Sequence, residues 1–563
     1  MVIALLTVVC LHAQNRYDVL ITEIMADPSP QVGLPNAEWI ELKNVSATAV
    51  NLQNWRIGDS GGLSGNLPAY ILQPDSFVII CTASALAQLS AFGPAVAVSS
   101  FPSLDNDGEL LFLRNAAAMT LHAVAYASSW YHNETKKEGG WSLEMTDTQN
   151  PCGGMENWKA AVHPAGGTPG RVNSVQAINR DDQPPRLLRS YTRDSLTVIL
   201  VFDEPVDSST ASAPGHYQLD GGISLSQALP LAPLFTQVQL KTTTALQPGL
   251  VYILKAGSLR DCRGNTSAQN GEVKTGLPAE ALPGEWIINE ILFNPRSTGT
   301  DFVELMNNSP KILDASKLFI ANRNSSGTIS SIRVLSPEPF YVFPGERIAV
   351  TEDRGSLLRE YFVQQPALLL QPASMPSFPD EEGYVLALGA QGQVLDEVHY
   401  RDDWHFALIS NTEGISLEKI EPGAASQDPS SWHSAASGSG YATPTALNSQ
   451  YRNNAAAPAM ISCSPKMFSP DNDGRDDILS IQYSFPEPGY VASITLFDVA
   501  GRPVRYLVRN ALVGVTGQWF WDGLGEQGKQ LPAGPYILLS ECFNLQGKKF
   551  RERQALVLAR PLR

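Results

Sequence analysis

The sequence predicts an all-β protein built from several β-sandwich modules in tandem. At 563 residues the chain is too long for one hydrophobic core, and a prior of about 150 residues per domain suggests roughly four domains. Its 44 Gly and 40 Pro separate short apolar or alternating runs, a pattern typical of strands and turns rather than of long helices. Internal repetition is the third observation, and it indicates that one large module is present twice.

The repetition is clearest in two strands near the start of each copy. ITEI at 21–24 recurs as INEI at 288–291, and EWIELKN at 38–44 recurs as DFVELMN at 301–307. The offset is 267 positions for the first strand and 263 for the second, so the length difference falls between the strands. Polar and apolar residues alternate in these runs, which predicts half-buried strands whose polar residues face solvent or cross-strand partners.

Two further runs of the first copy predict strands. FVIICT at 77–82 is continuously apolar, as in the core of a sandwich, and ELLFL at 109–113 follows the turn DNDG at 105–108. The counterpart of that turn, DEEG at 380–383, also precedes a strand. We therefore expect a hairpin turn at both positions.

A closing signature recurs near the end of each copy, offset by 274 or 275 positions. Its members are WSLE at 141–144 with ISLE at 415–418, Trp158 with Trp432, TP at 168–169 with TP at 443–444, and NS at 173–174 with NS at 448–449. In this order the motifs resemble the lamin tail domain family, which is also found in many secreted bacterial proteins. The resemblance implies two immunoglobulin-like β-sandwiches, at 14–176 and 284–451, and so a fold class of all-β, tandem immunoglobulin-like β-sandwich modules.

The segment between the copies has a different pattern. LTVILVF at 196–202 runs into DEPVD at 203–207, HYQL at 216–219 and LVYIL at 250–254 follow, and DCRGN at 261–265 closes the pattern. These motifs resemble the bacterial Ig-like domains of surface proteins. The resemblance implies a third, spacer-sized sandwich at 184–278.

The last hundred residues carry a third set of motifs. They are FSPDNDGRDD at 468–477, SITLFD at 493–498, GRPV at 501–504, WDG at 521–523 and LPAGPYIL at 531–538. Together they resemble the C-terminal Ig-like domains of the flagellar hook-capping and gliding-motility type. At the C-terminus of proteins from Bacteroidota-like bacteria, such a domain commonly directs passage through the type IX secretion system, so we expect a sorting domain at 457–563.

The start of the chain indicates export. Residues 2–11 form an apolar run that is too short to span a bilayer and has the length of a signal-peptide core, which predicts a signal peptide at 1–13. Lipidation of Cys10 is disfavoured, because Val9 stands where a small residue is needed. No later apolar segment is long enough to cross a membrane, so we expect no integral membrane segment after signal removal.

The net charge and the cysteine pattern limit the classes of partner and the kinds of cysteine site that the chain is expected to have. The net charge of −16 repels phosphate backbones, so nucleic acid and anionic membranes are unfavourable partners. Five cysteines follow the signal peptide without a CxxC pattern, which indicates neither a zinc site nor a disulfide framework. Most are expected to be small buried residues, and Cys463 with Cys542 is the pair to test for a bond.

Acidic residues that recur are the first candidates for chemistry. Glu23 corresponds to Glu290 and Glu41 to Glu304, and paired carboxylates can polarise water or hold a cation. Because all four lie within alternating strands, we favour a framework role for them.

A second acidic group lies in the last module. Asp471, Asp473, Asp476 and Asp477 gather around Gly474, and several carboxylates on a tight loop suit Ca²⁺. The spacing starts like an EF-hand, but Ser480 stands where the bidentate Glu belongs. A solvated turn is favoured over a weak Ca²⁺ site, and no other cofactor is expected.

No catalytic constellation stands out in the sequence. There is no nucleophile elbow, HExxH, Walker or Rossmann pattern, and His399 and His405 flank Trp404 in a loop that suits partner contacts better than zinc. Trp130, Tyr131 and Trp404 leave open a carbohydrate-binding alternative.

We therefore expect an exported, non-catalytic protein that is secreted or held at the cell surface, on the exterior of the outer membrane. Display, adhesion or scaffolding is its expected work, with a cell-surface or extracellular protein or glycan and the type IX secretion machinery as partners. The alternative is a carbohydrate-binding accessory or hydrolase-associated protein.

Overall fold

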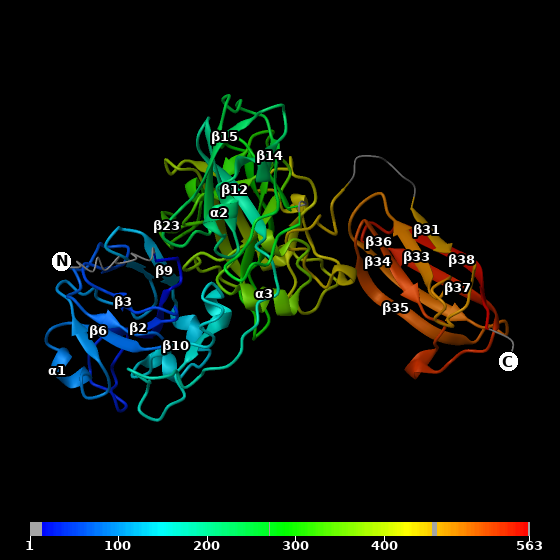
Figure 1. Ribbon diagram of the computed structural model, residues 1–563. Coiled ribbons are helices and arrows are strands. Elements are labelled where there is room, and N and C mark those ends of the chain that lie inside the picture. The colour runs from blue at the N-terminus through cyan, green and yellow to red at the C-terminus, as the bar shows by residue number, and fades with distance from the viewer. Residues whose placement is uncertain (1–13, 269–270, 453–458, 561–563) are drawn as a thin grey trace, which may run out of the picture. The chain divides into compact units, whose positions relative to one another are not determined.

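The computed structural model describes residues 14–268, 271–452 and 459–560 (Figure 1). Strands dominate this part of the chain, and the all-β fold class predicted from the sequence is confirmed. The predicted signal peptide, residues 1–13, lies outside the described residues. The strands form four groups in chain order: module A (β1–β11), module B (β12–β18), module C (β19–β30) and module D (β31–β38).

The chain forms two compact units. Unit 1 holds the described residues up to Leu246 together with Tyr252–Thr275, and so contains modules A and B. Unit 2 holds Gln247–Val251 and the described residues from Gly276 onward, and so contains modules C and D.

Module A packs a six-stranded sheet, in the order β11-β10-β1-β2-β6-β7, against the smaller sheet β4-β8-β9, with β3-β5 beside them. All its pairings are antiparallel except β6 with β7. Its strands are β1 Val19–Met25, β2 Trp39–Asn44, β3 Val50–Asn51, β4 Arg56–Gly58, β5 Ile71–Leu72, β6 Phe77–Cys81, β7 Ala95–Ala97, β8 Leu110–Arg114, β9 Thr120–Ala125, β10 Leu143–Met145 and β11 Trp158–Ala160.

Both faces of the large sheet of module A are covered, so our prediction of half-buried first strands was wrong. Every residue of β1 and β2 is buried. One face lies on the main core, which contains Trp55 and Trp158. The other face carries a second apolar cluster, which includes Trp39 of β2 and Leu89 of the short helix α1 (Leu86–Leu89). The closing segment, residues 166–175, also covers this face.

Module C repeats this arrangement, with one additional strand, β23, at the edge of its smaller sheet. Its large sheet runs β30-β29-β19-β20-β25-β26, and its smaller sheets are β23-β22-β27-β28 and β21-β24. The β-bulge between Ile21 and Glu23 recurs between Ile288 and Glu290, and the last pairing, β25 with β26, is again parallel. Its strands are β19 Trp286–Leu292, β20 Phe302–Asn307, β21 Leu313–Asp314, β22 Phe319–Arg323, β23 Ile329–Val334, β24 Tyr341–Val342, β25 Arg347–Thr351, β26 Leu369–Leu370, β27 Glu382–Leu388, β28 Val394–Arg401, β29 Leu417–Lys419 and β30 Trp432–Ser434.

The two acidic turns that precede strands β8 and β27 are not hairpins, which corrects the prediction made for 105–108 and 380–383. The strands on either side of each turn belong to different sheets: β7 pairs with β6 whereas β8 pairs with β4 and β9, and β26 pairs with β25 whereas β27 pairs with β22 and β28. Each turn therefore carries the chain from one layer of the sandwich to the other.

Module B is a smaller sandwich of the sheets β12-β13-β16-β15 and β14-β17-β18. The apolar run predicted at 196–202 forms its buried strand β13, and Asp207 caps the short helix α2 (Ser208–Ala211) by accepting from the backbone N–H groups of Ser209 and Thr210. Its strands are β12 Leu187–Asp194, β13 Thr197–Phe202, β14 Tyr217–Leu219, β15 Leu225–Pro230, β16 Gln237–Thr242, β17 Tyr252–Ala256 and β18 Gly271–Thr275.

Module D packs the sheet β32-β38-β37-β34-β35 against the sheet β31-β33-β36. Trp521 lies at the centre of its core, with the rings of Phe468 and Tyr536 edge-on to the indole at centroid distances of 5.1 and 5.5 Å. Its strands are β31 Met460–Ser464, β32 Met467–Phe468, β33 Leu479–Ser484, β34 Tyr490–Phe497, β35 Pro503–Val513, β36 Thr516–Trp521, β37 Gly534–Phe543 and β38 Lys549–Leu558.

The third α-helix, α3 (Arg354–Glu360), lies in module C and begins at Asp353, whose side chain accepts from the N–H of Ser356. None of the helices in the described ranges has the length and apolar character that a membrane crossing requires.

Candidate functional site

The recurring glutamates lie in a row across the large sheet of each copy. In module A, Glu23 of β1 pairs with Glu41 of β2 on one side and with Glu144 of β10 on the other. The row contains three carboxylates, and the side chain of each has no solvent exposure. The predicted pair Glu23 and Glu41 is thus brought together, with Glu144 as a third member.

These carboxylates hold the closing segment of module A onto the sheet. Glu23 Oε1 accepts from the Thr168 N–H at 2.8 Å, and Glu41 Oε2 accepts from the Gly170 N–H at 2.7 Å. Glu144 accepts from the Thr168 hydroxyl and from the Ser174 hydroxyl, both at 2.7 Å. Each glutamate therefore satisfies donors of a segment more than twenty residues further along the chain.

Module C builds the same fastening with the row Glu290, Glu304 and Glu418. Glu290 Oε1 accepts from the Thr443 N–H at 2.8 Å, and Glu304 Oε2 accepts from the Thr445 N–H at 2.6 Å. Glu418 accepts from the hydroxyls of Thr443 and Ser449, both at 2.8 Å. The repeated Thr-Pro and Asn-Ser pairs of the sequence are the segment that the carboxylates bind.

One position of the closing segment requires a left-handed backbone. Gly170 has φ +78°, and its counterpart Thr445 has φ 61°. Glycine adopts this conformation without steric cost, whereas a β-branched residue does not. The Thr445 side chain compensates by accepting from the Gln365 N–H at 2.8 Å.

Burial determines the protonation of these groups. It raises the pKa of Glu23 well above its usual range, with the charges of Glu41 and Glu144 adding to the effect, and it raises the pKa of Glu41 to about 8. In module C burial likewise raises the pKa of Glu290 well above its usual range and that of Glu304 to about 8. Glu23 Oε2 is buried without a hydrogen-bond partner among the described residues, so a charge on this group would be poorly compensated.

The rows are therefore built for structure rather than for chemistry on a substrate. Acid–base catalysis requires the carboxyl to reach a substrate, and all six side chains have zero exposure. In the described chain, neither row brings three carboxylate oxygens within 4.8 Å of one another, as a shared metal ion would require. Our framework interpretation agrees with this geometry, but the side chains face a covering segment and not solvent.

The β-bulge in the first strand of each copy frees a backbone N–H, which a side chain of the opposite sheet then satisfies. In module A the Ile21 N–H donates to His122 Nδ1 at 3.0 Å, and in module C the Ile288 N–H donates to Asp396 Oδ2 at 2.8 Å. Burial lowers the pKa of His122 to about 4, so the imidazole is neutral at pH 7 and Nδ1 remains an acceptor. Asp396 is partnered by Lys419, whose Nζ lies 3.8 Å away.

The cysteine pairing differs from our prediction. Cys152 of module A and Cys262 of module B form a disulfide across 110 positions, whereas Cys463 and Cys542 are free and buried. Cys463 lies in β31 and Cys542 in β37, which belong to different sheets of module D. Burial raises the pKa of both thiols, to about 11 and about 12, so they are inert, as buried structural thiols are.

The predicted calcium residues of module D only partly converge. Asp471, Asp473 and Asp477 place ligand atoms within 4.8 Å of one another, and Asp476 is not in that group. The Asp477 carboxylate already accepts from three backbone N–H groups, those of Asp471, Asn472 and Gly474, at 2.6 to 3.1 Å. These three bonds close the loop.

The histidines and aromatic residues singled out in the sequence do not form one site. His399 stacks on Tyr384 and bonds Glu382 at 2.6 Å, while His405 is buried and bonds the Ser434 hydroxyl at 2.9 Å. Tyr131 is buried, its hydroxyl donating to the Trp141 carbonyl.

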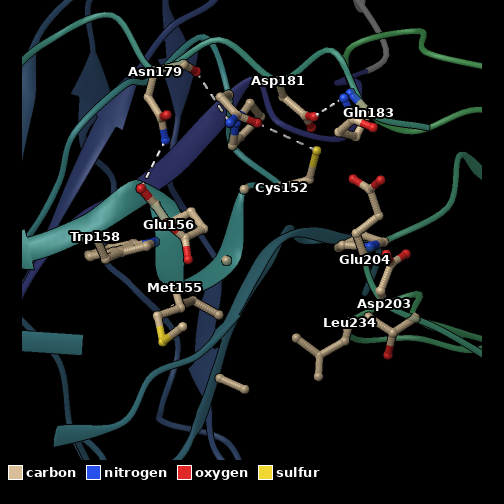
Figure 2. A pocket seen from close by; sticks show the side chains of 18 of the residues that line it. Cys152, Met155, Glu156, Trp158, Asn179, Asp181, Gln183, Asp203, Glu204 and Leu234 are labelled. Carbon is tan, nitrogen blue, oxygen red and sulfur yellow. Dashed lines mark hydrogen bonds between the residues drawn. The ribbon is translucent and has the colours of Figure 1, made fainter. Parts of the chain in front are cut away.

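Trp130 and Trp404 occupy equivalent short 3-10 helices, Ser128–Tyr131 and Asp402–Trp404, and both pack on their own module's core. Trp130 also lines a cavity in unit 1, shown in Figure 2. That cavity contains acidic residues of the A–B junction that we did not single out, among them Asp181 and Glu204. The DEPVD motif at 203–207 was the sequence signal for Glu204.

Residues 12–128 match the family model described as Lamin Tail Domain. The match confirms one lamin tail domain at the start of the chain, as the repeated motifs of module A predicted. No curated protein matches the sequence.

Several solved structures resemble the chain weakly. One is surface layer protein SbsC, domains 1–6, with 9% identity over 67% of this chain and 54% of that chain and a TM-score of 0.16. Another is PorZ, a surface component of the type IX secretion system of Porphyromonas gingivalis, with 9% identity over 93% of this chain and 74% of that chain and a TM-score of 0.16. A Ca²⁺-stabilized adhesin of an Antarctic bacterium gives 9% identity over 97% of this chain and 100% of that chain, with a TM-score of 0.12. The chain spans about half the length of the SbsC structures it matches. At these TM-scores the likenesses carry no argument about function.

Proposed function

We propose that this protein is an exported, non-catalytic component of the cell exterior that acts in display, adhesion or scaffolding. The observation that carries the proposal is the use of the recurring acidic side chains. All six are fully buried and bonded within their own module, so the residues common to both copies build the fold and leave the loops to bind partners.

We also propose the module assignments beyond the first lamin tail domain. Module C, with module boundaries at 284–451, is a second lamin tail domain, and its strand order, its bulge and its glutamate row support this assignment. Module B at 184–278 is a bacterial Ig-like domain, and module D at 457–563 is a C-terminal sorting domain. The two-sheet architecture of both modules is consistent with these assignments.

The proposed partners follow from this location. A protein or glycan of the cell surface or extracellular space would meet the loops, and the type IX secretion machinery would recognise module D. The test is to delete residues 457–563 and to fractionate the cells. Retention of the truncated chain in the periplasm would support the sorting role, and unchanged surface display would refute it.

A carbohydrate-binding accessory remains the second candidate, because Trp130 is half-buried and lines a cavity. A glycan array probed with the full-length protein and with Trp130→Leu separates the candidates. Binding that the substitution abolishes would favour the accessory, whereas no binding to any glycan would favour a scaffold.

For the loop of module D we propose weak Ca²⁺ binding by Asp471, Asp473 and Asp477, supported by the convergence of their oxygens. Calorimetry with EDTA and then Ca²⁺ tests it, since an ion that binds only the folded state raises the Tm. An unchanged Tm of module D in millimolar Ca²⁺ would leave the turn as the loop's only role.

A further inference from the structure

A cavity of about 650 Å³ lies in unit 1, where modules A and B meet the segment that joins them (Figure 2). This volume lies within the range of small-molecule sites. Its lining is mixed: Trp130, Met155 and Leu234 provide apolar surface, and Asp181 and Glu204 provide carboxylates.

Covalent and hydrogen bonds hold the walls of this cavity in place. The Cys152–Cys262 disulfide joins module A to module B, and Cys152 itself lines the cavity. Asn265 Nδ2 donates to the Asp181 carbonyl at 3.1 Å, and Asn179 Nδ2 donates to the Glu156 carbonyl at 3.0 Å. The cavity is therefore preformed, which lowers the entropic cost of binding.

The charge of the lining is unbalanced. Its acidic members outnumber its one arginine, Arg180, and they are Glu156, Asp181, Asp182, Asp203 and Glu204. Asp203 is neutralised by Arg186, which lies outside the lining and whose Nε is 2.7 Å from the carboxylate. Among the described residues neither Asp181 nor Glu204 forms an ion pair, although the charge of Arg263 acts on Asp181. Figure 2 shows the two carboxylates close to each other and to the Cys152 sulfur.

The excess of negative charge in the lining affects the Glu204 carboxylate most clearly. This carboxylate accepts no hydrogen bond from any residue in the described ranges, and oxygens of Glu204 and Asp181 lie within 4.8 Å of each other. Burial raises the pKa of Glu204 to about 8, and the charges of Asp181, Asp261 and Asp203 add to the effect while Arg186 opposes it. A bound positive charge would remove this repulsion.

We propose that this cavity binds an organic cation, with the Asp181 and Glu204 carboxylates on an ammonium or guanidinium group and the apolar lining on its carbon chain. The charged group comes either from a free amine or from a Lys or Arg side chain of a partner protein. A neutral glycan would leave the carboxylate repulsion in place. A bare metal ion would fill little of the cavity, and the neighbouring Cys152 sulfur is in a disulfide and so offers no thiolate ligand.

Protons are linked to this binding. The free protein holds Glu204 largely protonated at pH 7, whereas the complex requires its carboxylate. Binding therefore releases a proton, and the affinity rises as the pH increases from about 6 to about 8.

The test is isothermal titration calorimetry of the full-length, oxidised protein with three cationic probes: 1,4-diaminobutane, Nα-acetyl-lysine amide and a hexalysine peptide. We expect saturable binding that Glu204→Gln weakens at least about tenfold. Asp220→Asn, at an exposed acidic residue of module B outside the cavity, makes the same carboxyl-to-amide substitution and is expected to leave the affinity unchanged within about twofold. Tighter binding of the diamine identifies a free amine as the source, and tighter binding of the peptide identifies a partner's side chain.

Trp130→Leu provides an independent variant, and the Tm of each protein shows that it is folded. If Glu204→Gln does not fold, loss of binding in folded Trp130→Leu supports the proposal and retention of binding refutes it. Failure of all three probes at millimolar concentration overturns the proposal. Equal affinities of Glu204→Gln and Asp220→Asn also overturn it, as does binding of Ca²⁺ or cellohexaose in the cavity without binding of an amine. The experiment makes no use of cellular location, so its failure would leave the proposed surface role untouched.

Discussion

Replacing Glu23 by alanine removes the acceptor that fastens the first closing segment. The Thr168 N–H, bonded to Glu23 Oε1 at 2.8 Å, would lose the acceptor that it has among the described residues, in a buried site. The Ser142 hydroxyl, which donates to the same oxygen at 2.5 Å, could turn to the Gly166 carbonyl, 3.4 Å away. A buried donor without a partner costs about 1–3 kcal/mol, and the space left by the side chain adds about 1 kcal/mol more. We expect a loss of about 3 kcal/mol in the free energy of unfolding of module A.

Differential scanning calorimetry at pH 7 measures this change. A loss of about 3 kcal/mol lowers the Tm of a module of about 150 residues by roughly 6–12 °C. The matched control is Glu23→Gln, which keeps an oxygen acceptor and carries no charge. It should cost less than about 1 kcal/mol, because burial raises the pKa of Glu23 well above its usual range and so favours the neutral form. Equal losses in the two variants would show that Glu23 acts as a charged carboxylate, and our account of its burial would be wrong.

Two further predictions concern His122 and the disulfide. The pKa of His122 is about 4 in the folded protein and about 6.5 in the unfolded chain, so protons bind the unfolded chain first, and about 3 kcal/mol of stability is lost as the pH falls from 6.5 to 4. His122→Asn keeps an acceptor for Ile21 and should lack this loss. The buried glutamates act in the opposite direction, so the difference between the two proteins in urea unfolding at each pH is the quantity to measure, and a constant difference would contradict the assignment. Reduction of Cys152–Cys262, or Cys152→Ser with Cys262→Ser, should destabilise unit 1 by about 2–4 kcal/mol and leave the unit 2 transition unchanged. Peptide mapping without reductant that finds both thiols free would refute the bond.

The sequence was sufficient to predict the all-β architecture, because the residue patterns that indicate strands and turns are local. The run at 77–82 became β6, the run at 196–202 became β13, and the repeated motifs of modules A and C correspond to the same strand order. Turn residues and period-2 patterns act over a few positions, so they survive the loss of all tertiary information.

Burial and pairing were harder to predict because they depend on distant segments. Glu23 and Glu41 look solvent-facing within their strands, and only the segment near Thr168, more than a hundred residues later, covers them. Cys152 and Cys262 belong to different modules, so no local spacing indicates their bond. The recurrence of the closing signature was the available signal for the covering segment, because Thr and Ser hydroxyls and backbone N–H groups at equivalent positions donate to the glutamates in both copies.

Hydrogen exchange at the closing segments tests the central claim, that the recurring glutamates hold these segments onto the large sheets by hydrogen bonds. The N–H groups of Thr168, Gly170 and Val175 are bonded to Glu23, Glu41 and Glu144, and those of Thr443, Thr445 and Gln450 to the second row. Four of these six bonds are buried and two, those of Gly170 and Val175, are partly buried. Peptides covering 166–176 and 440–451 should therefore exchange as slowly as strands β2 and β20. Exchange at the rate of an exposed loop in either segment would contradict the claim.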